Sequence, residues 1–393
     1  MGFSLRGKED SFMFGELHIL LILTGGTIGT MVGEDGKRRL PSSGESAEPV
    51  LLNRLREQEP EMHFSAEIRT PYEVLSEHMT LGHLEKLAKC LKSEDLTKYD
   101  GVFITHGSDT LAFTAAFLGV LMRGCPVPVF LLAAQRPLED PESNGVENAR
   151  AALHLMETWE EYRRGSECEF TPCFMDDMQG DGIKSVSGLR NSGLSPVYVP
   201  YRNSDGMYLH RAEELRQCQP GTDDFFSGGM QSLKKSSDGR YVWPGEWKRQ
   251  ELDGKKQQKL NEETRSGLDE QLPQEATRDG DTVQGSWLVP DISLAPDVLL
   301  LHPYVGIRYD CISLEGIRAV LHTMYHSSTA PKELVRFLDR CREAGVPCYI
   351  LPCDPENFHY ETTAELLEHG AIPISGMSEE SAYMRLVMNR LPE

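Results

Sequence analysis

Short, continuous apolar runs separated by amphipathic stretches constrain the fold of this chain more than any other feature. The runs 18–23, 101–105 and 127–132 are continuously apolar apart from His18 and Thr105 at their ends, whereas a strand with one face in solvent would alternate apolar and polar residues. Between these runs apolar residues recur at helical spacing, as over 84–91. We therefore predict an α/β fold with a larger N-terminal domain, whose mostly parallel sheet is flanked by helices, and a smaller C-terminal α/β domain.

The composition changes sharply in the middle of the chain. Residues 228–290 are rich in Gln, Lys, Glu, Asp, Gly and Ser and contain few aliphatic side chains, so they cannot build a core. We predict an N-terminal domain at 16–227, a polar linker or insertion at 228–290 and a C-terminal domain at 291–393. Residues 160–195 fit the strand–helix rhythm less well, and we interpret them as a long excursion.

Charge and cysteine content exclude several classes of function. Acidic residues outnumber basic ones by 61 to 40, and a net charge of −21 disfavours nucleic acid and anionic membranes as partners. The nine cysteines include no C-x-x-C pair, which predicts reduced thiols and no metal site. The apolar run 19–23 is too short to span a bilayer. We expect a cytoplasmic protein.

Two turns combine glycine with hydroxyl side chains directly after predicted strands, where ligands bind in open parallel sheets. The first is Thr24-Gly-Gly-Thr-Ile-Gly-Thr30, in which Gly26 lets the backbone approach a ligand and Thr27 offers a hydroxyl. Taken alone, this segment is equally compatible with a plain tight turn. It matches neither a dinucleotide fingerprint nor a phosphate-binding P-loop.

The second turn is Thr105-His-Gly-Ser-Asp-Thr110, at the start of a predicted helix. Spacing alone favours Ser108 and Asp109 as helix N-caps, because Ser and Asp are preferred there. The alternative is a functional hydroxyl beside a carboxylate that binds an ammonium group. A third segment, Leu75 to Thr80, precedes another helix and offers either a cap or a grip on a substrate carboxylate.

Together these segments resemble the double signature of the asparaginase/glutaminase family, particularly its intracellular bacterial-type branch. The two signatures occur in the family's order, with the Ser76 segment between them. Further likeness occurs at 134–138, 144–148, 201–205, 325–331 and 370–374.

The resemblance implies that Thr27 is the nucleophile of an L-asparaginase. Its hydroxyl would attack the side-chain amide of asparagine and form an acyl-enzyme that water opens, which yields aspartate and ammonia. A threonine hydroxyl needs a base and a stabilised oxyanion, and backbone N–H groups near Gly26 and Ser108 would supply the second. No metal or organic cofactor is implied.

The resemblance also assigns substrate contacts. Ser76, with its neighbour Glu77, would hold the α-carboxylate, and Asp109 would hold the α-ammonium. The backbone carbonyl near Ala134 would face the leaving amide. Substrate held in this way would be oriented for attack.

The sequence departs from the family pattern in three places. Relatives usually carry Thr at the position of Ser108. The activating lysine should follow the Asp205-Gly206 turn, but the best-spaced residue is Arg211, beside His210, and only the histidine can shuttle protons near neutral pH. Secreted relatives carry a lid tyrosine, whereas the predicted lid at 33–46 has none.

Family active sites usually lie at a dimer face, so the resemblance implies a homodimer or homotetramer. Thr329 and Glu361 are the residues that a neighbouring subunit would contribute. Three alternatives stay open: a glutaminase or other related amidase, the ammonia-generating subunit of a tRNA-dependent amidotransferase, and a non-catalytic amino-acid-binding protein of the same fold. The amidotransferase subunit usually has an extra N-terminal domain, and the first signature at residue 24 argues against it.

Overall fold

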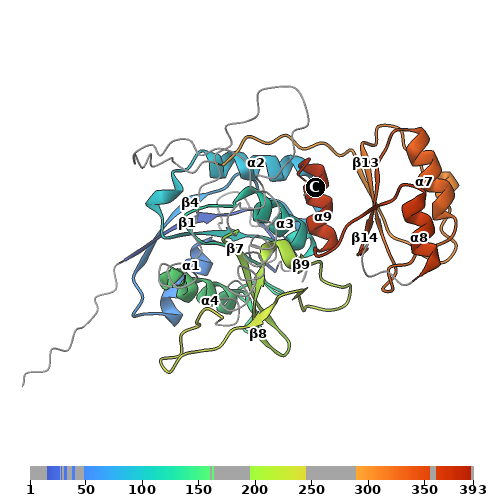
Figure 1. Ribbon diagram of the computed structural model, residues 1–393. Coiled ribbons are helices and arrows are strands. Elements are labelled where there is room, and N and C mark those ends of the chain that lie inside the picture. Colours follow the sequence, from blue (N-terminus) through green and yellow to red (C-terminus); the bar gives the residue numbers. More distant parts are fainter. Residues whose placement is uncertain are drawn as a thin grey trace, which may run out of the picture.

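The computed structural model describes residues 16–26, 28, 31–32, 38–39, 48–159, 162, 195–244, 289–354 and 360–390. Its larger sheet has seven strands in the order β11-β8-β7-β6-β5-β1-β4, and its second sheet has four in the order β12-β13-β14-β15. This confirms the predicted class, a large mostly parallel sheet flanked by helices plus a separate, smaller α/β unit (Figure 1).

The larger sheet is parallel at its centre. Strands β4, β1, β5, β6 and β7 are parallel, β8 pairs antiparallel with β7, and β11 pairs antiparallel with β8. Their bounds are β1 Leu17–Ile22, β4 Phe64–Arg69, β5 Gly101–Thr105, β6 Val129–Leu132, β7 Val197–Asn203, β8 Gly206–Arg211 and β11 Gln231–Ser232. The buried runs of β1, β5 and β6 form the strands predicted from their continuous apolar sequences.

Strand order identifies where a ligand would bind. The chain places β4 on one side of β1 and β5 on the other, so β1 and β5 are neighbours at the point where the winding reverses. In open parallel sheets, ligands bind beyond the carboxyl ends of the strands at such a switch point. The two predicted glycine turns follow β1 and β5, and both therefore lie at this point.

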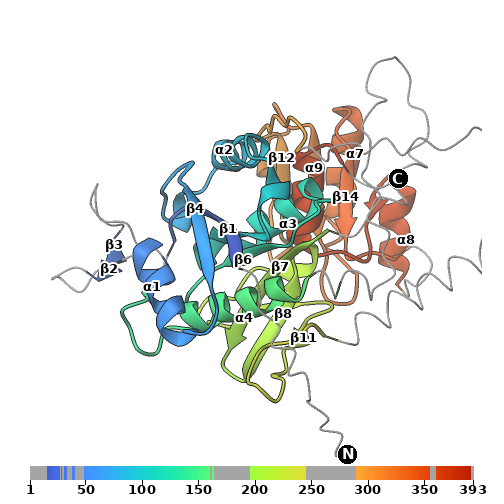
Figure 2. The same ribbon diagram turned by 90° about the vertical axis from the view of Figure 1, so that its left-hand side faces the viewer.

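Helices cover both faces of the larger sheet (Figures 1 and 2). One face carries α2 (Leu81–Lys92), α3 (Leu111–Leu121) and α9 (Glu379–Val387), and the other carries α1 (Glu48–Gln58) and α4 (Gly145–Glu157). Each face has its own core of fully buried side chains, for example Phe117 and Leu131 on the first and Phe103 and Phe130 on the second. Apolar burial on both faces is what the unpatterned strands require.

The smaller sheet is entirely parallel and has its own core around Phe337. Its strands are β12 Val298–Leu301, β13 Ala319–Thr323, β14 Cys348–Leu351 and β15 Ile372–Pro373, with helices α7 Leu334–Glu343 and α8 Glu361–Glu368. In Figure 1 this unit lies to one side of the larger sheet.

The last helix returns to the larger unit. We predicted that 291–393 forms one domain, but α9 packs against α3, with Tyr383 edge-on to Phe113 at a ring separation of 5.8 Å. Helix α9 therefore belongs to the N-terminal unit, where it buries apolar residues such as Met384.

The start of the predicted linker also belongs to the folded unit. Trp243 is buried on the α4 side and donates its indole N–H to the Leu155 carbonyl over 2.9 Å. The Tyr241 hydroxyl donates to Glu147 over 2.5 Å. These few aromatic residues were too weak a sign of burial in so polar a segment. Residues 245–288, and most of the 160–195 excursion, lie outside the described residues.

Candidate active site

The turns after β1 and β5 are joined by hydrogen bonds at the switch point. The Thr24 hydroxyl donates to the Thr105 carbonyl over 2.5 Å, and the Thr24 backbone N–H donates to the Thr105 hydroxyl over 3.3 Å. Both threonines are buried. The sequence repeats Thr at the end of both strands, and these side chains fix the two turns against each other.

Glycines allow the turns to touch. Gly25 and Gly26 have φ of +100° and +85°, which L side chains rarely adopt. A Cβ on Gly26 would lie 2.1 Å from the backbone N of Gly107, and a Cβ on Gly107 would lie 2.4 Å from Ser76 Oγ. Backbone from three separate segments therefore meets at one place.

Ser76 connects the third segment to the second turn. It opens the short 3-10 helix η2 (Ser76–His78) and is 6% exposed. Its hydroxyl donates to Asp109 Oδ2 over 3.0 Å, and the Thr110 hydroxyl donates to the Ser76 carbonyl over 3.0 Å. Its neighbour Glu77 is exposed. The structure thus brings Ser76 and Asp109 together, and Ser108 lies beside them.

Ser108 and Asp109 are not helix caps, contrary to what spacing favoured. They belong to a 3-10 turn, η4 (Ser108–Thr110), inserted between β5 and α3, so Gly107 caps the turn and Thr110 caps α3. Neither position makes a side-chain capping bond. The extra turn moves Asp109 away from the helix amides and leaves its carboxylate to accept from Ser76.

His106 braces the second turn from inside. It is 1% exposed, its Nδ1 lies 2.8 Å from the Gly107 carbonyl, and its Nε2 lies 2.8 Å from the Thr114 hydroxyl. Burial lowers the His106 pKa to about 4, although the Gly107 carbonyl raises it. A neutral ring that donates from Nδ1 and accepts at Nε2 satisfies both contacts.

The end of β6 completes the edge beside β5. Ala134 is fully buried, and two asparagines fix the backbone around it. Asn148 donates to the Ala133 carbonyl over 3.0 Å, and Asn144 accepts from the Gln135 N–H over 2.9 Å. Ala134 therefore lies one strand away from the Ser108 turn, on the same edge of the sheet.

The chain is similar in sequence to known proteins. Residues 18–168 match the family model for the N-terminal part of asparaginase. The L-asparaginase of Thermococcus kodakarensis is 33% identical over 208 residues, which is 52% of this chain and 57% of that protein. The chain therefore matches just over half the length of this relative.

A second relative aligns along nearly the whole chain. A glutamyl-tRNA(Gln) amidotransferase component from Pyrococcus horikoshii is 24% identical over 394 residues, which is 96% of this chain and 74% of that protein. Two solved L-asparaginases share the fold. That of Thermococcus kodakarensis has a TM-score of 0.61 at 18% identity, covering 95% of this chain and 92% of its own. L-asparaginase I of Vibrio cholerae has a TM-score of 0.63 at 20% sequence identity, and the match covers 95% of this chain and 93% of that protein.

The N-terminal part of the chain is thus similar to asparaginase. Thr27, the nucleophile that the resemblance implies, lies outside the described residues, although its neighbours Gly26 and Ile28 are described. Most of the predicted lid at 33–46 also lies outside them. Its two described residues form β3 (Arg38–Arg39), which pairs antiparallel with β2 (Met31–Val32).

The structure does not bring His210 and Arg211 to the turns after β1 and β5. They pair with Val199 and Tyr198 in the antiparallel strand β8, three strands from β5, a separation of about 14 Å. His210 is fully buried, and burial lowers its pKa to about 3. The sequence suggested these residues by counting from the 205–206 turn, but β8 runs back down the sheet, away from the ligand edge.

Gln217 reaches the site instead, although nothing in the sequence indicated it. After β8 the chain turns through η6 (Ala212–Glu214) and returns along α3. The Gln217 side chain then donates to the backbone carbonyl of Asp109. Counting residues could not reveal this reversal, and no local motif marks Gln217.

Thr329 and Glu361 lie in the smaller unit. Thr329 accepts from the Tyr325 N–H over 2.8 Å, in the loop that follows β13. Glu361 is exposed at the start of α8, whose Thr363 donates to the Ser328 carbonyl over 2.6 Å. The two candidates are thus on adjoining segments of this unit, apart from the Ser76–Asp109 pair.

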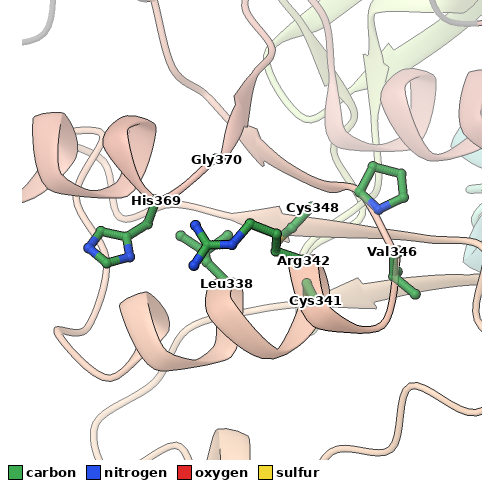
Figure 3. A pocket seen from close by; sticks show the side chains of 9 residues that line it. Leu338, Cys341, Arg342, Val346, Cys348, His369 and Gly370 are labelled. Atoms are coloured by element: carbon green, nitrogen blue, oxygen red, sulfur yellow. The ribbon is translucent and has the colours of Figure 1, made fainter.

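A pocket in the smaller unit is separate from these residues. Figure 3 shows Arg342 extending across it toward His369, with Cys341 and Cys348 in its lining. None of the predicted site residues lines this pocket. Within the described ranges, no group of three or more His, Cys, Asp or Glu side chains is placed to hold a metal ion, and no helix is long and apolar enough to cross a membrane.

Proposed function

We propose that this protein is an L-asparaginase that hydrolyses the side-chain amide of asparagine to aspartate and ammonia. The observation that carries the proposal is the contact between Ser76 and Asp109 beside the Gly26 turn, at the β1–β5 switch point. A hydroxyl donor next to a carboxylate suits a ligand that carries both a carboxylate and an ammonium group.

The site residues around the turns after β1 and β5 have the following roles in this proposal. Asp109 would bind the α-ammonium through an ion pair, and Ser76 would donate to the α-carboxylate once substrate displaces its present bond. Backbone N–H groups of the crowded turns around Gly26 and Ser108 would stabilise the oxyanion. The carbonyl near Ala134, on the next strand, would accept from the leaving amide.

Thr27 would be the nucleophile. Its hydroxyl oxygen would form a bond to the amide carbon as the carbon–nitrogen bond breaks. The amide nitrogen would take up the proton given up by the hydroxyl and leave as ammonia, and water would then open the ester to aspartate. His210 and Arg211 are not retained as the base, because they lie on β8, three strands from β5. We propose that the protein needs no cofactor and works as a homo-oligomer in the cytoplasm, with Thr329 and Glu361 facing a neighbouring subunit's site.

The test is ammonia release by the purified protein with asparagine or glutamine. We expect asparagine to be the better substrate. Thr27→Ala should abolish release while aspartate still binds in calorimetry, and Thr97→Ala, at an exposed threonine before β5, should leave the rate unchanged.

One alternative is favoured by a specific observation. Relatives that are components of glutamyl-tRNA(Gln) amidotransferases align along 94–96% of the chain. A strong preference for glutamine in the same assay would support a glutaminase-type function. Binding without turnover would support a non-catalytic amino-acid-binding protein.

A further inference from the structure

Gln217 holds the backbone of the two residues that we place around the substrate. It follows the short strand β9 (Leu215–Arg216). Its side-chain amide nitrogen donates to the carbonyl of Asp109 and also lies 3.4 Å from the carbonyl of Ser108. One neutral amide therefore fixes the main chain from which both side chains project.

Glu380 in turn holds Gln217. The backbone N–H of Gln217 donates to Glu380 Oε1 over 2.5 Å. Glu380 is the second residue of α9, and only 4% of its surface is exposed. Gln217 thus connects the C-terminal helix to the Ser108–Asp109 turn: its backbone bonds to Glu380 and its side chain to Asp109.

A second contact fixes α9 to the same segment. Arg385, one turn further along α9, bonds to Glu213, which also accepts from Arg123 over 2.7 Å. Residues 213–217 are therefore attached to the C-terminal helix at both ends. Two attachment points restrict rotation as well as translation of the segment that presents Gln217.

The burial of Glu380 is costly for a purely structural contact. Taking a carboxylate out of water requires compensating partners. Among the described residues, Glu380 Oε2 and Gln217 Oε1 have no hydrogen-bond partner. Buried polar groups that stay incompletely paired are uncommon, and each calls for an explanation such as strain, a catalytic role or a bound water.

We propose that Gln217 is a positioning residue for Ser108 and Asp109, and that Glu380 sets the position of Gln217, so that the C-terminal helix forms part of the active site. The kinetic part of this inference rests on the proposed hydrolase function. The positional part does not, because it concerns the backbone of residues 108–109.

The test uses two substitutions and a matched control in the full-length protein. Gln217→Met keeps side-chain length and removes the amide, Gln217→Asn keeps an amide that is too short, and Gln219→Met alters an exposed glutamine of the same loop. We expect both Gln217 variants to lower kcat for asparagine about 10- to 100-fold with a much smaller change in KM, since misplacement of reacting groups has effects of this size. Gln219→Met should match the wild type.

Two substitutions of Glu380, one disruptive and one conservative, test its role in positioning Gln217. Glu380→Ala should lower kcat as Gln217→Asn does, and the double variant should be no worse than either single one. Glu380→Gln keeps an acceptor oxygen and should stay within about 3-fold of wild type, because one hydrogen bond is preserved. Equal loss in Glu380→Gln and Glu380→Ala would contradict a role in positioning Gln217.

Hydrogen exchange decides the positional part without any substrate. Backbone amides in the peptide spanning 106–112 should exchange faster in Gln217→Asn and Glu380→Ala than in wild type or Gln219→Met. Unchanged exchange and unchanged kcat in the Gln217 variants would overturn the proposal. If the wild type releases no ammonia, the hydrolase function fails, and the exchange result still decides whether Gln217 positions the turn.

Discussion

The hydroxyl of Ser76 donates a hydrogen bond to the carboxylate of Asp109 over 3.0 Å, although the two residues are 33 positions apart in the chain. The contact joins η2 to the turn after β5 at the edge where ligands bind in parallel sheets. A donor and an anion side by side are what an amino acid's carboxylate and ammonium groups require. The account of function depends on this pair.

Separate substitutions of Ser76 and Asp109 should distinguish binding of the substrate carboxylate from binding of its ammonium group. Ser76→Ala removes one bond to the substrate carboxylate and should raise KM for asparagine about 10-fold, as expected for a hydrogen bond to a charged group. Asp109→Asn removes the counter-charge of the ammonium and should lower kcat/KM at least about 100-fold. Steady-state ammonia kinetics measure both.

Ser93→Ala is the control for this pair, because Ser93 is an exposed serine at the end of α2. It should behave as the wild type. Kinetics of Ser76→Ala indistinguishable from those of Ser93→Ala would show that Ser76 does not contact the substrate.

The buried His106 predicts a loss of stability in acid. Its pKa is about 4 in the folded protein, whereas a histidine in the unfolded chain titrates near 6.5. Between these values the unfolded state binds more protons, so the free energy of unfolding should fall as pH drops from about 6.5 to 4, by up to about 1.4 kcal/mol per pH unit. Above pH 6.5 this histidine should have no effect on the slope.

Urea unfolding at a series of pH values tests this prediction. His106→Asn removes the titrating ring and should flatten the slope between pH 4 and 6.5 relative to wild type, whatever its effect on stability at pH 7. His210→Asn should act in the same direction, since burial lowers the His210 pKa to about 3. An unaltered slope in both variants would contradict neutral buried rings.

Substitution of two glycines that have the same φ should distinguish the energetic cost of backbone strain from that of steric crowding. Gly26 and Gly239 both have φ of +85°, but a Cβ on Gly239 meets nothing within 4 Å, whereas one on Gly26 lies 2.1 Å from the Gly107 N. Gly239→Ala should cost about 1–2 kcal/mol from the left-handed conformation alone. Gly26→Ala should cost at least about 3 kcal/mol or prevent folding, because backbone must also move.

Thermal and urea unfolding of the two glycine variants provide the comparison. Equal losses in both would mean that the turns after β1 and β5 are not in close contact. The proposal that the predicted site residues meet where these two turns touch would then be wrong.

The sequence predicted the strands that are buried on both faces and the glycine turns that follow two of them. Continuous apolar runs predicted β1, β5 and β6, and the position of Thr24–Gly26 and Thr105–Asp109 at strand ends followed from them. The edge strand β4 went unnoticed because Phe64–Arg69 mixes polar and apolar residues. Helix α1 was also missed, since its apolar residues follow a Gly- and Ser-rich stretch.

Contacts between distant segments could not be predicted from the sequence. Capping was the better local explanation for Asp109, and only the inserted 3-10 turn and the approach of Ser76 displace it. Likewise, spacing suggested Arg211, whereas the reversal of the chain after β8 carries Gln217 to the site. Glu380, 163 residues further along, has no local feature that would associate it with Gln217.

The most direct test of the central claim is a paired measurement on wild type and Thr27→Ala: ammonia released from asparagine, and calorimetric binding of aspartate. We predict that the wild type releases ammonia and prefers asparagine to glutamine, and that Thr27→Ala binds aspartate but releases none. Ammonia release by Thr27→Ala at the wild-type rate, or a wild type that binds aspartate without hydrolysing asparagine, would contradict the account.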